Sequence, residues 1–244
     1  MKPFLFLGTR AEDAAADSEY AAVLEYSALP ESELHRRRLE AEPLGEVSLE
    51  DWSGIILGGG PFNVSDPDDA KSSTQHRVES ELGELAARVV AADFPFLGAC
   101  YGIGTLGCLS GGVVDRSYGE PVGRARIELS PEGQADPLFG VLPSAFDAFL
   151  GHKEAVSRLP AGAVLLASSA ACPVQAFRLG RHVYATQFHP ELDSAGLATR
   201  VEVYRDFGYF RDDEIASILH VAETSEVTEP ERLLARFVEL FAVS

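Results

Sequence analysis

The sequence predicts an α/β fold with a doubly wound, mostly parallel sheet that helices flank on both faces. Two observations carry this prediction. Short continuous apolar segments, typical of strands buried on both faces, alternate with longer segments of helical periodicity. The 244 residues are 46% hydrophobic and 24% charged, which is a composition typical of a globular protein with a full core.

The first half of the chain supplies most of this alternation. Residues 3–8 (PFLFLG) are apolar and end in glycine, so we expect a buried strand, and the Ala-rich residues 11–28 predict the first helix. Residues 35–41 fit either a helix or a strand. The further elements that we expect are a strand at 54–57, a polar surface loop at 62–73, a helix at 76–92 and a strand at 94–98.

The second half of the chain changes character. Residues 113–150 are richer in glycine and proline and alternate apolar with polar residues, which predicts an exposed, antiparallel part of the sheet. Three helical stretches follow residue 193, and Thr228 with Glu231 predicts a capping box at the start of the last one. Later strands are expected at 164–167, 174–177 and 182–187. We interpret residues 1–244 as one domain, with a catalytic core of about 1–192 and a helical C-terminal extension of about 193–244.

Charge and cysteine content narrow the classes of function. With 38 acidic and 20 basic side chains the net charge is −18, which disfavours nucleic acid and anionic membranes as partners. Three cysteines are too few for a disulfide framework, and we expect Cys108 and Cys172 to be packed structural thiols. We find no signal-peptide pattern and no run of 18 apolar residues, so we expect a cytoplasmic protein.

A candidate nucleophile follows the strand expected at 94–98. Gly98-Ala99-Cys100-Tyr101-Gly102 has the Gly-x-nucleophile-x-Gly pattern between an apolar strand and an expected helix, which is the context of a nucleophile elbow. The N-terminus of that helix would stabilise a thiolate on Cys100. The alternative is a buried structural cysteine beside a glycine-rich turn.

A candidate base follows the strand expected at 182–187. His189 could take the proton of Cys100, and Glu191 could orient the imidazole, at the strand end where α/β sheets gather catalytic groups. An ordinary His-Pro turn is one alternative. A His-x-Glu metal pair is another, but it needs a third ligand, and His152, His182 and Asp193 are only loosely suggestive. We therefore expect no metal.

A glycine-rich turn, Gly58-Gly59-Gly60-Pro61, follows the strand expected at 54–57. Glycines there let backbone N–H groups approach a substrate, and two such groups can stabilise a tetrahedral oxyanion. In elbow enzymes one donor comes from the residue after the nucleophile, here Tyr101. A plain turn is the alternative, and a phosphate loop is disfavoured because no Gly-Lys-Ser/Thr pattern follows.

These motifs, in this order, resemble the class I (triad-type) glutamine amidotransferases, and among them most closely the amidotransferase domain of GMP synthases. The resemblance covers about residues 50–192. The segments that carry it are Ile55–Pro61, Pro95–Gly102, Gly151–Val156, Cys172–Phe177 and Gln187–Glu191.

The resemblance implies that Cys100 attacks the side-chain amide of glutamine and that His189 protonates the departing ammonia. A γ-glutamyl thioester would form, water would release glutamate, and Glu191 would orient His189. The resemblance further implies oxyanion donors in the Gly59–Gly60 turn and at Tyr101, with substrate contacts at Gly123 and Arg124. It implies no cofactor, glutamine as the substrate, and a possible separate synthetase that takes up the ammonia as a partner subunit.

Two departures from the family pattern leave other functions open. Gly104 stands where family members usually have a glutamine that helps to hold the substrate. Residues 194–244 show no Ser-Gly-Gly phosphate loop of an ATP-pyrophosphatase domain, so we expect that this chain does not itself activate an acceptor. The alternatives are an independent hydrolase of γ-glutamyl amides or peptides with the same triad, and a non-enzymatic binding module.

Overall fold

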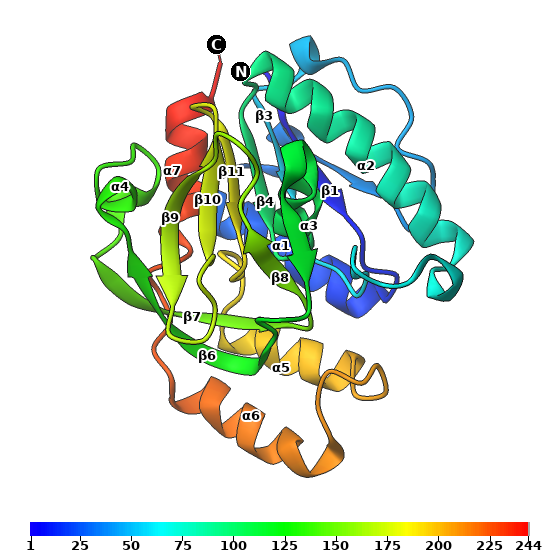
Figure 1. Ribbon diagram of the computed structural model, residues 1–244, viewed down its shortest axis with the longest axis vertical. Helices are drawn as coiled ribbons and strands as arrows, with labels where there is room; N and C mark the ends of the chain where they lie inside the picture. The colour runs from blue at the N-terminus through cyan, green and yellow to red at the C-terminus, as the bar shows by residue number, and fades with distance from the viewer. Residues whose placement is uncertain (244) are drawn as a thin grey trace.

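The computed structural model describes residues 1–243, whose centre is a mixed nine-stranded sheet (Figure 1). Its strands, in chain order, are β1 (Phe4–Gly8), β2 (Leu34–Arg38), β3 (Gly54–Leu57), β4 (Phe96–Ala99), β6 (Glu120–Leu129), β7 (Ala145–His152), β9 (Val164–Ser169), β10 (Ala176–Leu179) and β11 (Val183–Thr186). A separate ribbon joins β5 (Val113–Asp115) to β8 (Ala155–Arg158). The order across the sheet is β2-β1-β3-β4-β11-β10-β9-β6-β7.

The sheet has a parallel part and an antiparallel part. β1 pairs in parallel with β2 and β3, β3 with β4, and β4 with β11. Beyond β11 every pairing is antiparallel, and the pairing of β6 with β7 confirms the antiparallel part predicted for residues 113–150. Because parallel strands end at the same edge, the loops after β1, β3, β4 and β11 are brought together.

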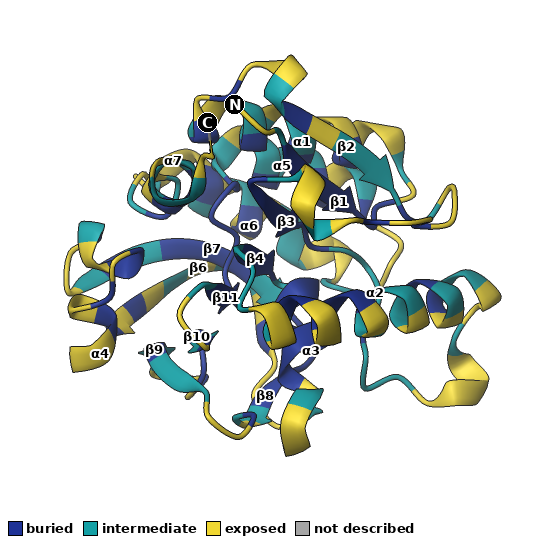
Figure 2. Cartoon of the chain, turned by 90° about the horizontal axis from the view of Figure 1, so that it is seen from above, coloured by how far each residue is buried: buried dark blue, intermediate teal, exposed yellow. Residues whose placement is uncertain are grey.

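Helices cover both faces of the parallel part (Figure 2). The helices of the described residues are α1 (Asp13–Ser27), α2 (Ser73–Ala92), α3 (Tyr101–Gly107), the single turn α4 (Pro131–Gln134), α5 (Ser194–Val203), α6 (Asp212–Thr224) and α7 (Arg232–Phe241). In Figure 2, α2 and α3 lie below the sheet, and α1, α5 and α7 lie above it. The predicted doubly wound α/β fold is therefore confirmed.

Strand β1 shows why both faces need a cover. Phe4 and Phe6 point into one buried cluster, where Phe4 packs on Phe237 of α7 at a ring separation of 6.0 Å. Leu5 and Leu7 point into the opposite cluster, to which α2 and α3 also contribute residues. All four side chains are fully buried. Each contributes about 1.5–3 kcal/mol by leaving water, and this stabilises a strand that is apolar on both faces.

A third apolar cluster joins α5 and α6 to the antiparallel strands. Leu197 and Val201 of α5 and Ile218 of α6 pack with Phe149 of β7. In Figure 1 these two helices lie beneath β6 and β7, at the carboxyl edge of the parallel strands. The segment between α5 and α6 is thereby held close to the loops that this edge carries.

Two local expectations have a clear outcome. The ambiguous residues 35–41 form a strand, β2, because their backbone pairs with β1. The predicted capping box of Thr228 and Glu231 is wrong. α7 begins at Arg232, four residues after Thr228, and Glu231 already has helical backbone angles with no side-chain cap. Within residues 1–243 no helix is long and apolar enough to cross a membrane.

Candidate active site

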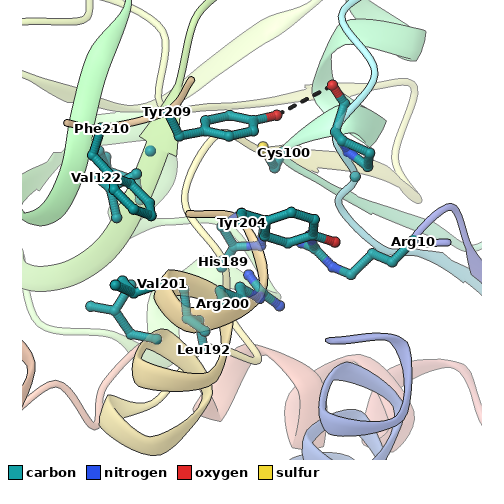
Figure 3. A pocket seen from close by; sticks show the side chains of 15 residues that line it. Arg10, Cys100, Val122, His189, Leu192, Arg200, Val201, Tyr204, Tyr209 and Phe210 are labelled. Carbon is teal, nitrogen blue, oxygen red and sulfur yellow. Dashed lines mark hydrogen bonds between the residues drawn. The ribbon is translucent and has the colours of Figure 1, made fainter. Parts of the chain in front are cut away.

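The carboxyl ends of four neighbouring parallel strands meet at one pocket. Arg10 follows β1, Gly60 follows β3, Cys100 follows β4, and His189 follows β11, and all four line this pocket (Figure 3). The predicted nucleophile and the predicted base are thus brought together although 89 residues separate them. An alanine Cβ built on Gly59 would lie 2.5 Å from Cε1 of His189 and 3.3 Å from Cβ of Cys100, so only glycine lets the three residues pack this closely.

Cys100 has the backbone of a nucleophile elbow. Its φ of 51° and ψ of −90° are unusual for a residue with a side chain, a conformation that costs about 1–3 kcal/mol. The turn stays tight because a Cβ on Gly98 would lie 3.0 Å from the backbone of Gly102. The Cys100 N–H donates to the Thr186 carbonyl at 2.8 Å, which fixes the turn to β11. The strand-turn-helix context expected for Cys100 is present, with the seven-residue α3 following it.

A chain of buried polar contacts orients His189. Its Nδ1 lies 2.8 Å from Oε1 of Glu191, and Nη2 of Arg200 on α5 donates to the same oxygen at 2.7 Å. Because Glu191 occupies Nδ1, the other ring nitrogen is left for the proton of a nucleophile. Arg200 was not singled out from the sequence, because nothing in the pattern of α5 marks its inward face.

A second set of charged side chains supports the polar contacts around His189. Glu19 of α1 accepts from Nε of Arg10 at 3.0 Å, from Nη2 of Arg200 at 3.3 Å and from the Gly59 N–H at 3.2 Å. Arg10 also donates to the Tyr204 hydroxyl at 3.2 Å. Two arginines thus neutralise two carboxylates in the interior. The one sequence signal was the position of Arg10, which comes two residues after the end of β1 at the edge where the site lies.

Burial sets the protonation states of the pair. It raises the pKa of Cys100 to about 12, although Arg10 and Arg200 act in the opposite direction. The pKa of Cys100 is thus shifted in the direction opposite to the one expected from the helix N-terminus, because desolvation is the largest cause. Burial also lowers the pKa of His189 to about 4, against the opposing charge of Glu191 and with help from Arg200. The resting pair is a neutral thiol and a neutral imidazole.

Glu191 stays ionised at the same site. Burial alone would raise the pKa of Glu191, but His189 and Arg200 hold it well below its usual range. A charged carboxylate at this position favours the imidazolium that forms when His189 takes a proton.

The backbone N–H groups of the site differ in whether they already donate a hydrogen bond. The Gly59 N–H is used by Glu19, whereas the hydrogen bonds found within residues 1–243 include none from the N–H of Gly60 or Tyr101. Gly60 tolerates no side chain, because a Cβ there would lie 2.0 Å from Oγ1 of Thr9. Gly60 and Tyr101 therefore keep the two N–H groups that the sequence suggested for an oxyanion, while Gly59 has a packing role.

The space next to Gly104 is occupied by the side chain of Glu154. A Cβ on Gly104 would lie 3.2 Å from Oε1 of Glu154, which is held by the N–H groups of Val64 and Ser65 at 2.9 and 2.8 Å. Glu154, Gly104 and Gln187 line a second pocket that also contains Cys100. A glutamine side chain at this position would meet Glu154.

Other residues singled out from the sequence lie apart from Cys100. Arg124 is exposed, pairs with Asp147 at 3.1 Å and lines neither pocket, and Gly123 lies beside it at an irregular point of β6 with a φ of 158°. Cys172 is buried as expected. The expectation for Cys108 is wrong, because it is exposed where the short α3 ends.

The metal alternative finds little support in the donor set. His152 bonds to Glu120 at 2.9 Å, His182 lies beside Asp93, and Asp193 caps α5, so these residues do not gather around His189. Glu19 does lie close to His189 and Glu191. However, both carboxylates already bind a guanidinium, and a second cation there would be repelled.

An elbow cysteine, a histidine held by a glutamate and a glycine turn lie together at one sheet edge, and this is the arrangement that cysteine-dependent acyl transfer requires. The family model "Glutamine amidotransferase class-I" matches residues 22–202. The chain belongs to this family and is an enzyme of the amidotransferase class.

Individual relatives agree with this assignment. The chain is 31% identical over 157 residues to a GMP synthase [glutamine-hydrolyzing] of Thermosipho melanesiensis, a match that covers 64% of this chain and 27% of the relative. The chain thus spans about a quarter of the length of the curated relatives it matches. A Thermotoga maritima glutamine amidotransferase structure has a TM-score of 0.77 at 20% identity, with 100% of both chains covered. The structure of a putative GMP synthase subunit from Thermoplasma acidophilum has a TM-score of 0.60 at 22% identity, covering 91% of this chain and 98% of that one.

Proposed function

We propose that this protein hydrolyses the side-chain amide of glutamine through a catalytic triad of Cys100, His189 and Glu191. The observation that carries the proposal is the relay from Arg200 through Glu191 to His189 at 2.7 and 2.8 Å, beside a cysteine in elbow geometry. A histidine this well oriented, in a pocket with a thiol, has the arrangement that nucleophilic catalysis requires.

The neutral resting pair defines the order of proton movements. His189 takes the Cys100 proton as sulfur attacks the amide carbon, and Glu191 stabilises the imidazolium. The N–H groups of Gly60 and Tyr101 stabilise the oxyanion, a donor pair whose loss costs about 3 kcal/mol per donor. The imidazolium then protonates the leaving nitrogen, ammonia departs, and a γ-glutamyl thioester remains. Water attacks the thioester with His189 as its base and releases glutamate.

The second part of the proposal concerns the fate of the ammonia. The relatives matched include glutamine-hydrolysing GMP synthases and a putative GMP synthase subunit, which supports delivery to a separate synthetase. We propose that residues 1–244 act as one domain in this role, with the helices after residue 193 completing the site through Arg200.

The test is glutamate and ammonia release from glutamine by the purified chain, with Cys100→Ala and Cys108→Ala side by side. We expect Cys100→Ala to abolish release with an unchanged circular dichroism spectrum, and Cys108→Ala to retain it, because Cys108 is exposed outside the pocket. Turnover that survives Cys100→Ala would exclude the triad.

A further inference from the structure

Cys100 lines two pockets that differ in the polar groups they contain. One is the pocket with Gly104, Glu154 and Gln187, here called the polar pocket. Oε1 of Gln187 is buried there and has no hydrogen-bond partner within residues 1–243. The other is the pocket of Figure 3, here called the apolar pocket, which contains His189.

About half of the residues that line the apolar pocket follow His189 in the sequence. Its walls include Val122, Leu150, Leu197, Val201, Tyr204 and Phe210. Tyr209 lies above Cys100 in Figure 3, with its hydroxyl donating to the Pro61 carbonyl at 3.3 Å. Nζ of Lys153 lies 4.3 Å from the centre of the same ring, which helps to hold it in place.

The position of His189 decides which part of a substrate each pocket takes. The general acid must reach the leaving nitrogen, so the leaving group lies on the His189 side, in the apolar pocket. The acyl group then extends into the polar pocket, where Glu154 and the unpartnered Gln187 oxygen can accept from the α-ammonium group of a γ-glutamyl substrate. Ammonia is small and polar, and an apolar wall contributes nothing to its departure.

Arg200, which lines the apolar pocket, has one donor without a partner. Nη1 of Arg200 is buried and makes no hydrogen bond within residues 1–243, while Nη2 holds Glu191 and Glu19. Arg200 is only 9% exposed, so an unpaired donor there is costly. A leaving group that carries both an apolar side chain and an acceptor such as a carboxylate would satisfy this donor and the apolar walls together.

We infer that the same site hydrolyses amides between the γ-carboxyl group of glutamate and an apolar amino acid. This further activity rests on the proposed triad. Cys100 sulfur bonds to the γ-carbonyl carbon, the C–N bond breaks, and the thiol proton passes through His189 to the leaving nitrogen. The free apolar amino acid departs, and water cleaves the thioester to glutamate and regenerates the thiol.

The test compares γ-glutamyl-leucine, γ-glutamyl-glycine and glutamine on the whole chain, by kcat/KM. The two dipeptides differ only in the apolar side chain. We expect γ-glutamyl-leucine to exceed γ-glutamyl-glycine by at least about 100-fold, since one methylene placed in an apolar pocket is worth about tenfold or more and leucine adds several apolar carbons. Equal values, or a preference for glycine, would overturn the inference.

Two variants of the apolar walls locate the preference. Val122 lies on β6 and Phe210 in the segment between α5 and α6, and we expect Val122→Ala and Phe210→Ala each to lower the leucine-to-glycine ratio about tenfold. Tyr118→Ala removes an exposed aromatic ring that lines neither pocket and should leave the ratio unchanged. A ratio that the wall variants do not change would place the leucine side chain elsewhere and overturn the inference.

The outcomes separate this inference from the proposed function. Turnover of glutamine that depends on Cys100, without a preference for leucine over glycine, leaves the triad standing and rejects the inference. No turnover of any of the three compounds rejects the proposed function, and the inference fails with it. γ-Glutamyl-isopentylamine, which lacks the carboxylate, should be about tenfold poorer than γ-glutamyl-leucine if Arg200 Nη1 binds that group. Equal rates would reject the assignment to an amino acid.

Discussion

Replacing Arg200 by glutamine should change the pH dependence of the enzyme. Nη2 of Arg200 lies 2.7 Å from Oε1 of Glu191, and that oxygen lies 2.8 Å from Nδ1 of His189. The guanidinium and imidazole nitrogens are therefore at most about 5.5 Å apart, and two unit charges at this distance interact by about 3 kcal/mol at an effective dielectric constant of about 20. The charge of Arg200 is thus a substantial part of what keeps His189 neutral.

The sign of the effect follows from the role of His189. Activity needs the neutral imidazole, so it is lost as the pH falls through the His189 pKa, which is about 4 in the native protein. Removing a nearby positive charge makes protonation easier, and about 3 kcal/mol corresponds to about 2 pH units, which places the acid limb of kcat/KM near about pH 6 in Arg200→Gln. Arg200→Lys keeps a charge and should retain a limb well below this value.

The assay is kcat/KM for glutamine after brief pH jumps between pH 3.5 and 8, with folding monitored by circular dichroism at each pH. kcat/KM reports the pKa values of the free enzyme, which is the state that the structure describes. An acid limb in Arg200→Gln that stays near pH 4 or moves lower, in protein that remains folded, would refute the assigned role of Arg200.

Three further predictions concern the triad, the glycine turn and the polar pocket. Glu191→Gln should lower kcat for glutamine by about 10²–10⁴-fold with little change in fold, because the imidazolium loses its countercharge. Gly60→Ala should lower the free energy of unfolding in urea by about 1–3 kcal/mol, because the new Cβ would overlap the Thr9 hydroxyl. Gly104→Gln should raise KM for glutamine about tenfold, because the longer side chain displaces Glu154 from its backbone donors.

Each of these predictions has a contradicting result. A Glu191→Gln enzyme with near-native kcat would show that His189 needs no charged partner. Gly83 of α2 is the control for Gly60, since a Cβ there meets nothing within 4 Å and alanine should stabilise the helix by about 0.5–1 kcal/mol. Equal unfolding energies for the two alanine variants would count against the packing argument. An unchanged or lower KM in Gly104→Gln would show that Glu154 does not hold the substrate side of the pocket.

The parts of the site predictable from sequence are those with a local signature. The turn at Cys100 needs small residues on both sides within five positions, and the histidine and glycine motifs each follow an apolar strand directly. Since parallel strands end at one edge, strand prediction alone brings these segments together. The same reasoning supplied the doubly wound sheet, because β1, β3, β4 and β11 are apolar on both faces.

The residues that sequence reasoning missed have no such signature. Glu19, Arg200 and Tyr204 lie on or after helices whose order around the site depends on tertiary packing, and their partners are up to 194 positions away. The direction of the Cys100 pKa was wrong for a related reason. The helix N-terminus is visible in the sequence, but the desolvation that outweighs it arises only when the loops after four strands close over the thiol.

The most direct test of the triad is to identify the cysteine that forms the acyl-enzyme. The chain would be mixed with glutamine, quenched in acid and digested, and the peptides containing Cys100, Cys108 and Cys172 would be compared by mass spectrometry. We predict a γ-glutamyl adduct on Cys100 alone, with none in His189→Ala, which cannot activate the neutral thiol. An adduct on Cys108 or Cys172 would contradict the account. So would turnover without any cysteine adduct, if the Cys100→Ala variant also retained that turnover.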